Sequence, residues 1–328
     1  MDPLDFAIYR YLSPGGEARF WAGRRIIDPT IPAREIADRV GISENGVRAR
    51  QRSLAERGFL GPKAVTPNPS LFGVRTYVAE LPVKQAGEVE RILRDLALVE
   101  GVVFARDVLD EEERKIRVHF VSEAESTTAR RAALLRRLSP TGELHAPQPY
   151  WIPPCEHELS PLDWRVLEAV WLQPDASIAD IGARVGISLK TTARRFHQLL
   201  ESRACWWTPG PTLEEFPLAL VWVYLNGPSD RESVAGKIAR EASEWMPVAS
   251  DGLGLDPGDS PALIAGLVPG DAPAILERML RKFVSFPGVT RVRRTFALGS
   301  TAYATWFGER ISDKARPRSK PPAKRSAR

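Results

Sequence analysis

The sequence is poor in the residues that build disulfide frameworks and metal sites. Its 328 residues include two cysteines, Cys155 and Cys205, and four histidines. These give neither a disulfide framework nor the spacing of a zinc site, and they suit a reducing compartment. Phosphate-binding glycine loops, nucleophile elbows and HExxH motifs are also missing. We therefore expect a protein that is not an enzyme and that carries no cofactor and no metal.

Long apolar runs are missing too. The longest strongly apolar run, "PLALVWVYL", is nine residues, whereas a membrane-spanning helix needs roughly 20. The start, "MDPLDFAIYRYL", lacks the basic region of a signal peptide. We expect a cytoplasmic protein without membrane contact. With 43% hydrophobic residues the chain can bury real cores, and its length favours two domains or more.

The positive charge is concentrated at one end of the chain. The formal net charge is +5, but the last fifteen residues, "KARPRSKPPAKRSAR", hold seven Lys and Arg and no acid. Without those seven, 39 basic residues face 41 acidic ones. Net charge alone therefore does not indicate nucleic-acid binding, and only local clusters of charge can do so.

A pentapeptide occurs twice. "RVGIS" is found at 39–43 and at 184–188, each time after a short apolar-periodic segment and before an arginine-rich one. The flanks agree in kind, since Arg50 matches Arg195 and Leu54 matches Leu199. Further upstream, "LDFAIYRYL" and "LDWRVLEAV" both read as helix starts, and the first copy carries an insertion near 15–27. Such self-similarity predicts two structurally related units.

The repeated residues predict a helix-turn-helix. Gly41 and Gly186 stand where a helix end favours the left-handed conformation, and Ser43 and Ser188 stand two residues later as N-caps of the next helix. A helix, a glycine turn and a serine-capped second helix form the DNA-binding unit. A plain helical hairpin is the alternative for one copy, but two copies with matched flanks favour DNA binding.

Each unit is followed by the same order of expected elements. After the first come an extended segment and strands or helices near 72–81, 83–99, 101–109, 115–122, 124–138 and 142–148. After the second, the order recurs near 217–225, 230–245, 247–255, 261–269, 271–286 and 289–298. Both read β-α-β-β-α-β, which is the ferredoxin-like arrangement. The fold class is therefore α+β, with two winged helix-turn-helix domains alternating with two ferredoxin-like domains.

With these features the chain resembles the leucine-responsive/asparagine-regulator (Lrp/AsnC) family of transcription factors. The resemblance rests on the opening "LD", the "RVGIS" turn, Arg50, Leu54 and "RGFL". It implies a tandemly duplicated sequence-specific DNA-binding regulator that binds double-stranded DNA, with sheet domains for dimerisation and small-molecule sensing. The expected divisions are winged units at 1–66 and 161–211, sheet domains at 71–150 and 215–300, a linker at 151–160 and a disordered basic tail at 313–328.

Helical register separates the DNA-facing residues from the core residues. Val47 and Leu54, with Thr192, Phe196 and Leu199, point inward. The predicted DNA contacts are the two caps and the outward residues of each second helix: Ser43, Asn45, Arg48, Arg52, Ser188, Lys190, Thr191, Arg194 and His197. The family keeps a structural arginine where this chain has Arg50 and Arg195, so we expect intramolecular pairs there. Trp206 and Trp207 are expected under a sheet rather than on bases.

The outward residues of the two second helices differ, so we expect one chain to read an asymmetric DNA site. The two sheet domains are expected to associate within the chain as an intrachain pseudo-dimer. Whether the chains also form homo-oligomers is left open. The candidate effector turn holds Asp256, Gly258 and Asp259.

The basic tail either adds phosphate contacts or is a solubilising end. Two alternatives remain. One is a siroheme-decarboxylase-like tetrapyrrole enzyme, which shares this build. The other is a scaffold that has lost DNA affinity.

Overall fold

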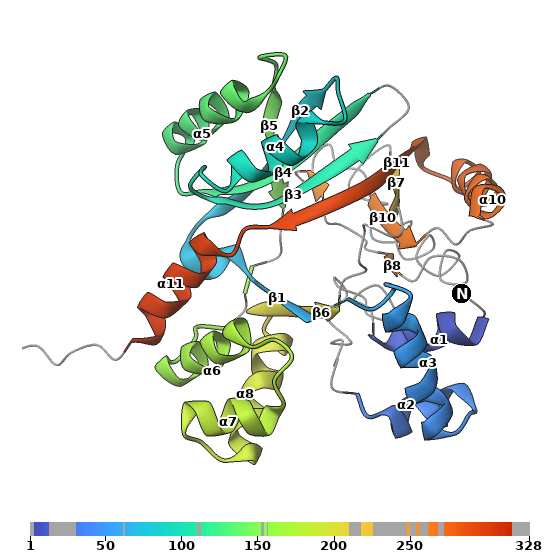
Figure 1. Cartoon of the computed structure of the whole chain (residues 1–328), viewed down its shortest axis with the longest axis vertical. Helices are drawn as coiled ribbons and strands as arrows, with labels where there is room; N and C mark the ends of the chain where they lie inside the picture. Colours follow the sequence, from blue (N-terminus) through green and yellow to red (C-terminus); the bar gives the residue numbers. More distant parts are fainter. Residues whose placement is uncertain are drawn as a thin grey trace, which may run out of the picture.

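The computed structural model describes residues 3–12, 31–61, 63–109, 113–151, 154–155, 157–209, 218–225, 248–249, 254–255, 262–267 and 272–316. These residues form two three-helix units at one end of the molecule's long axis and a long sheet at the other (Figure 1). Helices and strands thus alternate along the chain as an α+β fold, as predicted. No helix in these ranges is long and apolar enough to cross a membrane.

The two three-helix units have matching elements. The first comprises α1 (Pro3–Leu12), α2 (Ala33–Val40) and α3 (Glu44–Glu56), and the second comprises α6 (Pro161–Leu172), α7 (Ile178–Val185) and α8 (Leu189–Glu201). A short strand follows each unit, β1 (Lys63–Pro67) and β6 (Cys205–Pro209). These two strands pair antiparallel, with Lys63 opposite Pro209. The wings therefore link the two units to each other, a contact that the sequence pattern does not reveal.

The first sheet domain follows the predicted order. It consists of β2 (Arg75–Val83), α4 (Glu88–Leu96), β3 (Val102–Leu109), β4 (Arg114–Ser122), α5 (Glu125–Leu138) and β5 (His145–Trp151). The strands lie in the order β3-β4-β2-β5, which is the ferredoxin-like order. Alternate residues such as Leu81, Ile116 and Val118 are fully buried in one cluster with Ile92 of α4 and Leu135 of α5. The last strand begins three residues later than the expected range near 142–148.

The second sheet domain repeats this order of strands. It contains β7 (Leu218–Leu225), β8 (Val248–Ala249), β9 (Gly254–Leu255), β10 (Ala262–Leu267), α10 (Ala272–Val284) and β11 (Val289–Ala302), with strands arranged β8-β10-β7-β11. The helix expected near 230–245 and the insertion near 15–27 lie outside the described residues.

Strand pairing joins the two sheets within the chain. The last strand of the second half, β11, pairs antiparallel with β3 of the first half, with Phe296 opposite Leu109 and Ala302 opposite Phe104. In return, β5 of the first half pairs with β9 of the second. A nine-stranded sheet results, β8-β10-β7-β11-β3-β4-β2-β5-β9. The last strand of each half therefore pairs with a strand of the other half.

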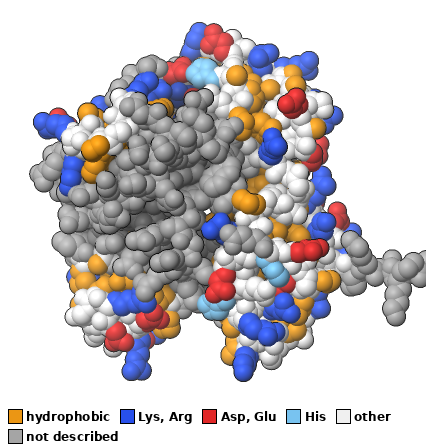
Figure 2. All heavy atoms as spheres, turned by 180° about the vertical axis from the view of Figure 1, so that it is seen from behind, with side chains coloured by type: hydrophobic (Ala, Val, Ile, Leu, Met, Phe, Trp, Pro, Cys, Tyr) orange, Lys and Arg blue, Asp and Glu red, His pale blue; other side chains and the backbone are white. Residues whose placement is uncertain are grey.

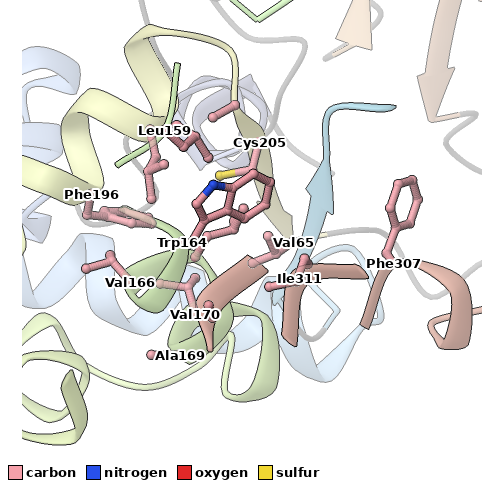
Figure 3. Packing of buried hydrophobic residues seen from close by; sticks show 14 of the residues in the cluster. Val65, Leu159, Trp164, Val166, Ala169, Val170, Phe196, Cys205, Phe307 and Ile311 are labelled. Atoms are coloured by element: carbon pink, nitrogen blue, oxygen red, sulfur yellow. The ribbon is translucent and has the colours of Figure 1, made fainter. Parts of the chain in front are cut away.

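The three-helix units pack on the sheet domain of the opposite half. The core of the second unit includes Trp164, Phe196 and Cys205 together with Val65 and Val121 of the first half (Figure 3). The 3-10 helix η1 (Pro69–Phe72) adds Phe72, whose ring lies 5.7 Å from that of Trp164. The core of the first unit in turn includes Ala297 of β11, with Tyr224 of β7 packed against it. Apolar burial of this kind fixes the units to the sheet.

A helix that the sequence analysis overlooked follows β11. This helix, α11 (Thr305–Ala315), buries Trp306, Phe307 and Ile311 against α6 and belongs to the same core cluster as Trp164. It corrects the predicted disordered tail at 313–328, because residues 313–315 form its last turn. They are ordered by the burial of Ala315 in that cluster. Residues 317–328 lie outside the described part of the chain.

Candidate nucleic-acid interface

The glycine turn of the first unit has the predicted geometry. Gly41 adopts φ 73° and ψ 32°, and its N–H donates to the carbonyl of Ala37 at 2.9 Å. This left-handed conformation ends α2 and is inexpensive only for glycine. Two residues later, the Oγ of Ser43 accepts a hydrogen bond from the N–H of Gly46 at 3.1 Å. The first turn of α3 is thereby capped and directed away from α2.

The second copy repeats this geometry. Gly186 adopts φ 76° and ψ 37°, and its N–H donates to the carbonyl of Gly182 at 2.8 Å. Ser188 caps α8 by accepting from the N–H of Thr191 at 3.3 Å. Gly182 also allows α7 and α8 to approach closely, since a Cβ there would lie 2.6 Å from the Oγ1 of Thr192. The predicted helix, glycine turn and serine cap are therefore confirmed in both copies.

The inward and outward faces of both second helices are as expected. Val47, Leu54, Thr192, Phe196 and Leu199 are buried. Of the nine predicted DNA contacts, Thr191 is half-buried. The other eight are exposed: Ser43, Asn45, Arg48, Arg52, Ser188, Lys190, Arg194 and His197. These residues are thus accessible to solvent, with Thr191 partly so. That they contact DNA stays a prediction.

The arginines Arg50 and Arg195 have the structural role expected of them. Arg50 Nη1 lies 2.6 Å from Asp5 Oδ1 in α1, and Arg195 Nη1 lies 3.2 Å from Asp163 Oδ1 in α6. Both carboxylates are buried, with side chains 9% and 1% exposed. The acidic residue of each "LD" start therefore holds the second helix to the first helix of its unit. These two arginines orient the outward residues rather than extending beyond the helix.

The two three-helix units lie toward the same end of the molecule. Both units occupy that end in Figure 1, and Figure 2 shows Lys and Arg side chains gathered at the tips of the two lobes. In a protein whose charge is otherwise nearly balanced, local positive charge of this kind is what attracts a phosphate backbone.

A second group of charged residues, which the sequence reasoning did not identify, lies in the first sheet. Lys115, Arg117 and His119 alternate along β4, on the face opposite the one that α4 and α5 cover. Glu80 of β2 accepts from Arg117 at 2.6 Å and lies 2.9 Å from Lys115 Nζ. Burial alone would raise the pKa of Glu80, but Arg117 and Lys115 outweigh burial and hold it at about 2. The i, i+2, i+4 spacing of basic residues was the signal available in the sequence.

His119 is the central residue of this charged group. Its ring lies edge-on to Phe104 with centroids 5.6 Å apart. Burial, with help from Arg106 and Arg117, lowers the pKa of His119 to about 3. The imidazole is therefore neutral at ordinary pH.

The remaining residues that the sequence analysis named lie only partly within the described residues. The candidate effector turn, Asp256, Gly258 and Asp259, lies outside the described residues. Trp206 is half-buried on β6 opposite Thr66, and the side chain of Trp207 lies outside the described part. No group of three or more His, Cys, Asp or Glu that could hold a metal ion is found within the ranges that the structure describes.

Comparison with known protein families identifies the units. The winged helix-turn-helix DNA-binding family matches twice, at residues 28–60 and 159–202. Both matches cover the helix, glycine turn and capped helix described above. The chain therefore carries two winged helix-turn-helix DNA-binding units, the class that serves transcription regulation. A search of curated proteins gives no match.

Solved structures with a related chain path have low identity. The siroheme decarboxylase NirDL is 12% identical, with 95% of this chain and 98% of that chain covered at a TM-score of 0.46. Its complex with an iron-uroporphyrin III analogue covers 86% of this chain and 92% of that one, also at 12% identity and TM-score 0.46. An AsnC family transcriptional regulator from Agrobacterium tumefaciens is 18% identical over 50% of this chain and 99% of its own, at 0.32.

One prediction is corrected by these comparisons. We expected a protein that is not an enzyme. That expectation is contradicted, because the matches that span most of the chain are to an enzyme, the siroheme decarboxylase NirDL. The absence of familiar short catalytic motifs was insufficient evidence against an enzyme, because the same chemistry recurs on unrelated folds.

Proposed function

We propose that this protein is a transcription regulator of Lrp/AsnC type in which α3 and α8 read the unlike halves of one asymmetric DNA site. The observation that carries the proposal is the antiparallel pairing of β1 with β6, which links two capped helix-turn-helix units within one chain. In the ordinary arrangement of such proteins, two identical chains read a palindrome. Here a tandem duplication within one chain supplies both units, and their outward residues differ.

The joined sheet supports the pseudo-dimer part of this proposal. Reciprocal pairing of β11 with β3 and of β5 with β9 gives one chain the kind of interface that two chains would otherwise form. The divisions at 1–66, 71–150, 151–160, 161–211 and 215–300 remain part of the proposal. The proposal also includes small-molecule sensing at Asp256, Gly258 and Asp259. It further includes assembly into homo-oligomers and phosphate contacts from the tail.

A binding selection from randomised duplexes tests the proposal. The full chain is expected to enrich an asymmetric site, with footprints protected at physiological salt. Arg52→Ala in α3 and Lys190→Ala in α8 should each weaken binding. Arg281→Ala is the charge-matched control, because Arg281 is 75% exposed on α10, outside both helix-turn-helix units. Enrichment of a perfect palindrome would contradict the proposal, and so would failure to enrich any sequence.

Salt dependence separates phosphate contacts from base contacts. A side chain that neutralises one phosphate contributes about one unit to the slope of log affinity against log salt. We expect Lys190→Ala to reduce that slope by about one while leaving base preference unchanged. Deleting residues 317–328 should also flatten it if the tail contacts phosphates, and an unchanged slope would leave the tail as a solubilising end.

A second candidate function is favoured by the charged group around His119. A neutral, buried imidazole with Arg106 nearby combines a potential iron ligand with a cation suited to a carboxylate, whereas Arg117 already donates to Glu80. Such a combination suits an anionic tetrapyrrole, so a tetrapyrrole enzyme is the alternative that we propose. An absorbance titration with an iron tetrapyrrole tests it. The candidate requires a shifted absorbance band that His119→Phe abolishes, and an unshifted spectrum would reject it.

A further inference from the structure

The two second helices begin with chemically opposite residues. Aligned on their N-caps, Ser43 and Ser188, the first helical residue is Glu44 in α3 and Leu189 in α8. Neither side chain is needed for the core, since that of Glu44 is 41% exposed and Leu189 is 59% exposed. Core positions of the two helices, by contrast, are buried in both copies. The difference therefore lies on the accessible surface.

Glu44 is joined to the neighbouring turn of its helix. Arg48 Nε and Nη2 both donate to Glu44 Oε1, at 3.1 and 2.6 Å, and the Arg48 side chain is 60% exposed. The pair thus presents a carboxylate and a guanidinium side by side. A carboxylate is repelled by phosphates, so its compatible partners in the major groove are base amino groups. Cytosine offers such a donor, and the guanine paired with it offers O6 and N7 to an arginine.

Leu189 suits a different base. An exposed leucine at the start of a capped helix has no polar group to pair with a base edge or a phosphate. The apolar group that a base pair displays in the major groove is the methyl of thymine. The first turn of α8 contains no acidic residue, and Lys190 follows directly. This helix start therefore combines an apolar contact with a cation.

We propose that Glu44, together with Arg48, and Leu189 set the base preference at equivalent positions of the two half-sites. The first unit selects a C·G pair there, and the second unit selects thymine. This assignment rests on the proposed function, because it requires that α3 and α8 enter the major groove. It adds the chemical reason why the site is asymmetric.

Reciprocal variants test the assignment. Selection from randomised duplexes is carried out with the full chain and with Glu44→Leu, Glu44→Gln and Leu189→Glu. Glu44→Leu should weaken the C·G preference in its half-site by about fivefold, the lower end of what a good base contact is worth, and should add a preference for thymine, because it removes the acceptor for the cytosine amino group but leaves Arg48 in place. Glu44→Gln should move the preference toward adenine. Leu189→Glu should replace thymine by cytosine in the other half-site only.

A matched control separates base reading from helix stability. Glu277 and Arg281 form the same i,i+4 pair on α10 at 3.1 Å, with both side chains more than half exposed. Glu277→Leu should leave both half-sites unchanged, and circular dichroism should show all variants folded. If Glu44→Leu leaves the C·G preference undiminished, the assignment is wrong while DNA binding stands. If the unmodified chain enriches no sequence, the proposed function fails and the assignment fails with it.

Discussion

Replacing Asp163 with alanine should loosen the second helix-turn-helix unit. This carboxylate has two tasks: it closes the capping box of α6, where the N–H of Ser160 donates to its Oδ2 at 2.9 Å, and it binds Arg195 of α8. It is 1% exposed, whereas Arg195 is 25% exposed. Asp180 occupies the same capping-box position in α7, accepting from Ser177 at 3.3 Å, but it is exposed. Asp180→Ala is therefore the matched control.

The magnitudes follow from these contacts. Loss of a capping box costs about 0.5–1 kcal/mol, and this loss is common to both variants. Asp163→Ala also leaves a guanidinium without its buried acceptor, at about 1.5–3 kcal/mol for a charged hydrogen bond. Loss of a fully buried pair would cost more, but partial exposure lets water solvate Arg195. We expect Asp163→Ala to cost about 2–4 kcal/mol and Asp180→Ala about 0.5–1 kcal/mol.

Hydrogen exchange of the full chain measures the difference locally. Amides of 161–201 should exchange roughly ten- to 150-fold faster in Asp163→Ala than in Asp180→Ala, since 1.4 kcal/mol corresponds to a factor of ten. Amides of α1 to α3 should be unaffected, because their own pair is Asp5 with Arg50. Equal acceleration in the two variants would refute the reasoning, as it would show that the Asp163–Arg195 pair adds nothing beyond the cap.

Three further outcomes are expected. Gly182→Ala should destabilise the second unit by about 1–3 kcal/mol in thermal melting, because its Cβ would lie 2.6 Å from Thr192 Oγ1, and Thr192→Ala should restore part of the loss. His119 has a pKa of about 3 in the native chain, against an ordinary value of 6.5, so between these pH values the unfolded chain binds a proton that the native chain does not. The stability of the native chain should therefore fall as the pH is lowered from 6.5 to 3. His119→Gln should flatten the dependence of the urea unfolding midpoint on pH. Phe307→Ala should speed exchange in α6 but not in α2, and an equal effect on both would contradict the packing of α11 on one unit alone.

Local pattern was sufficient for most of the secondary structure. Gly41 and Gly186 end helices, and Ser43 and Ser188 begin them, for reasons contained within five residues. The strands of the first sheet could likewise be read from two-residue alternation. Helix α11 was not predicted, because its apolar residues are buried against α6, which is more than 130 residues earlier in the chain.

The candidate site likewise has one part that could be predicted from the sequence and another that could not. The outward residues of α3 and α8 follow from helical register, so they could be named in advance and are accessible as expected. The pairing of Arg48 with Glu44 depends on side-chain conformation, and the group formed by Glu80, Lys115 and Arg117 depends on which strands are neighbours. Neither follows from composition.

The sequence by itself determined that this chain contains two helix-turn-helix units with different outward residues, because caps, turns and register are set by neighbours in the chain. Only the tertiary structure decided how the copies are combined. The pairing of β1 with β6 and of β3 with β11 joins residues more than a hundred positions apart, and each helical unit packs on the opposite half. Such contacts arise from edge hydrogen bonds and apolar surfaces whose partners no local pattern specifies.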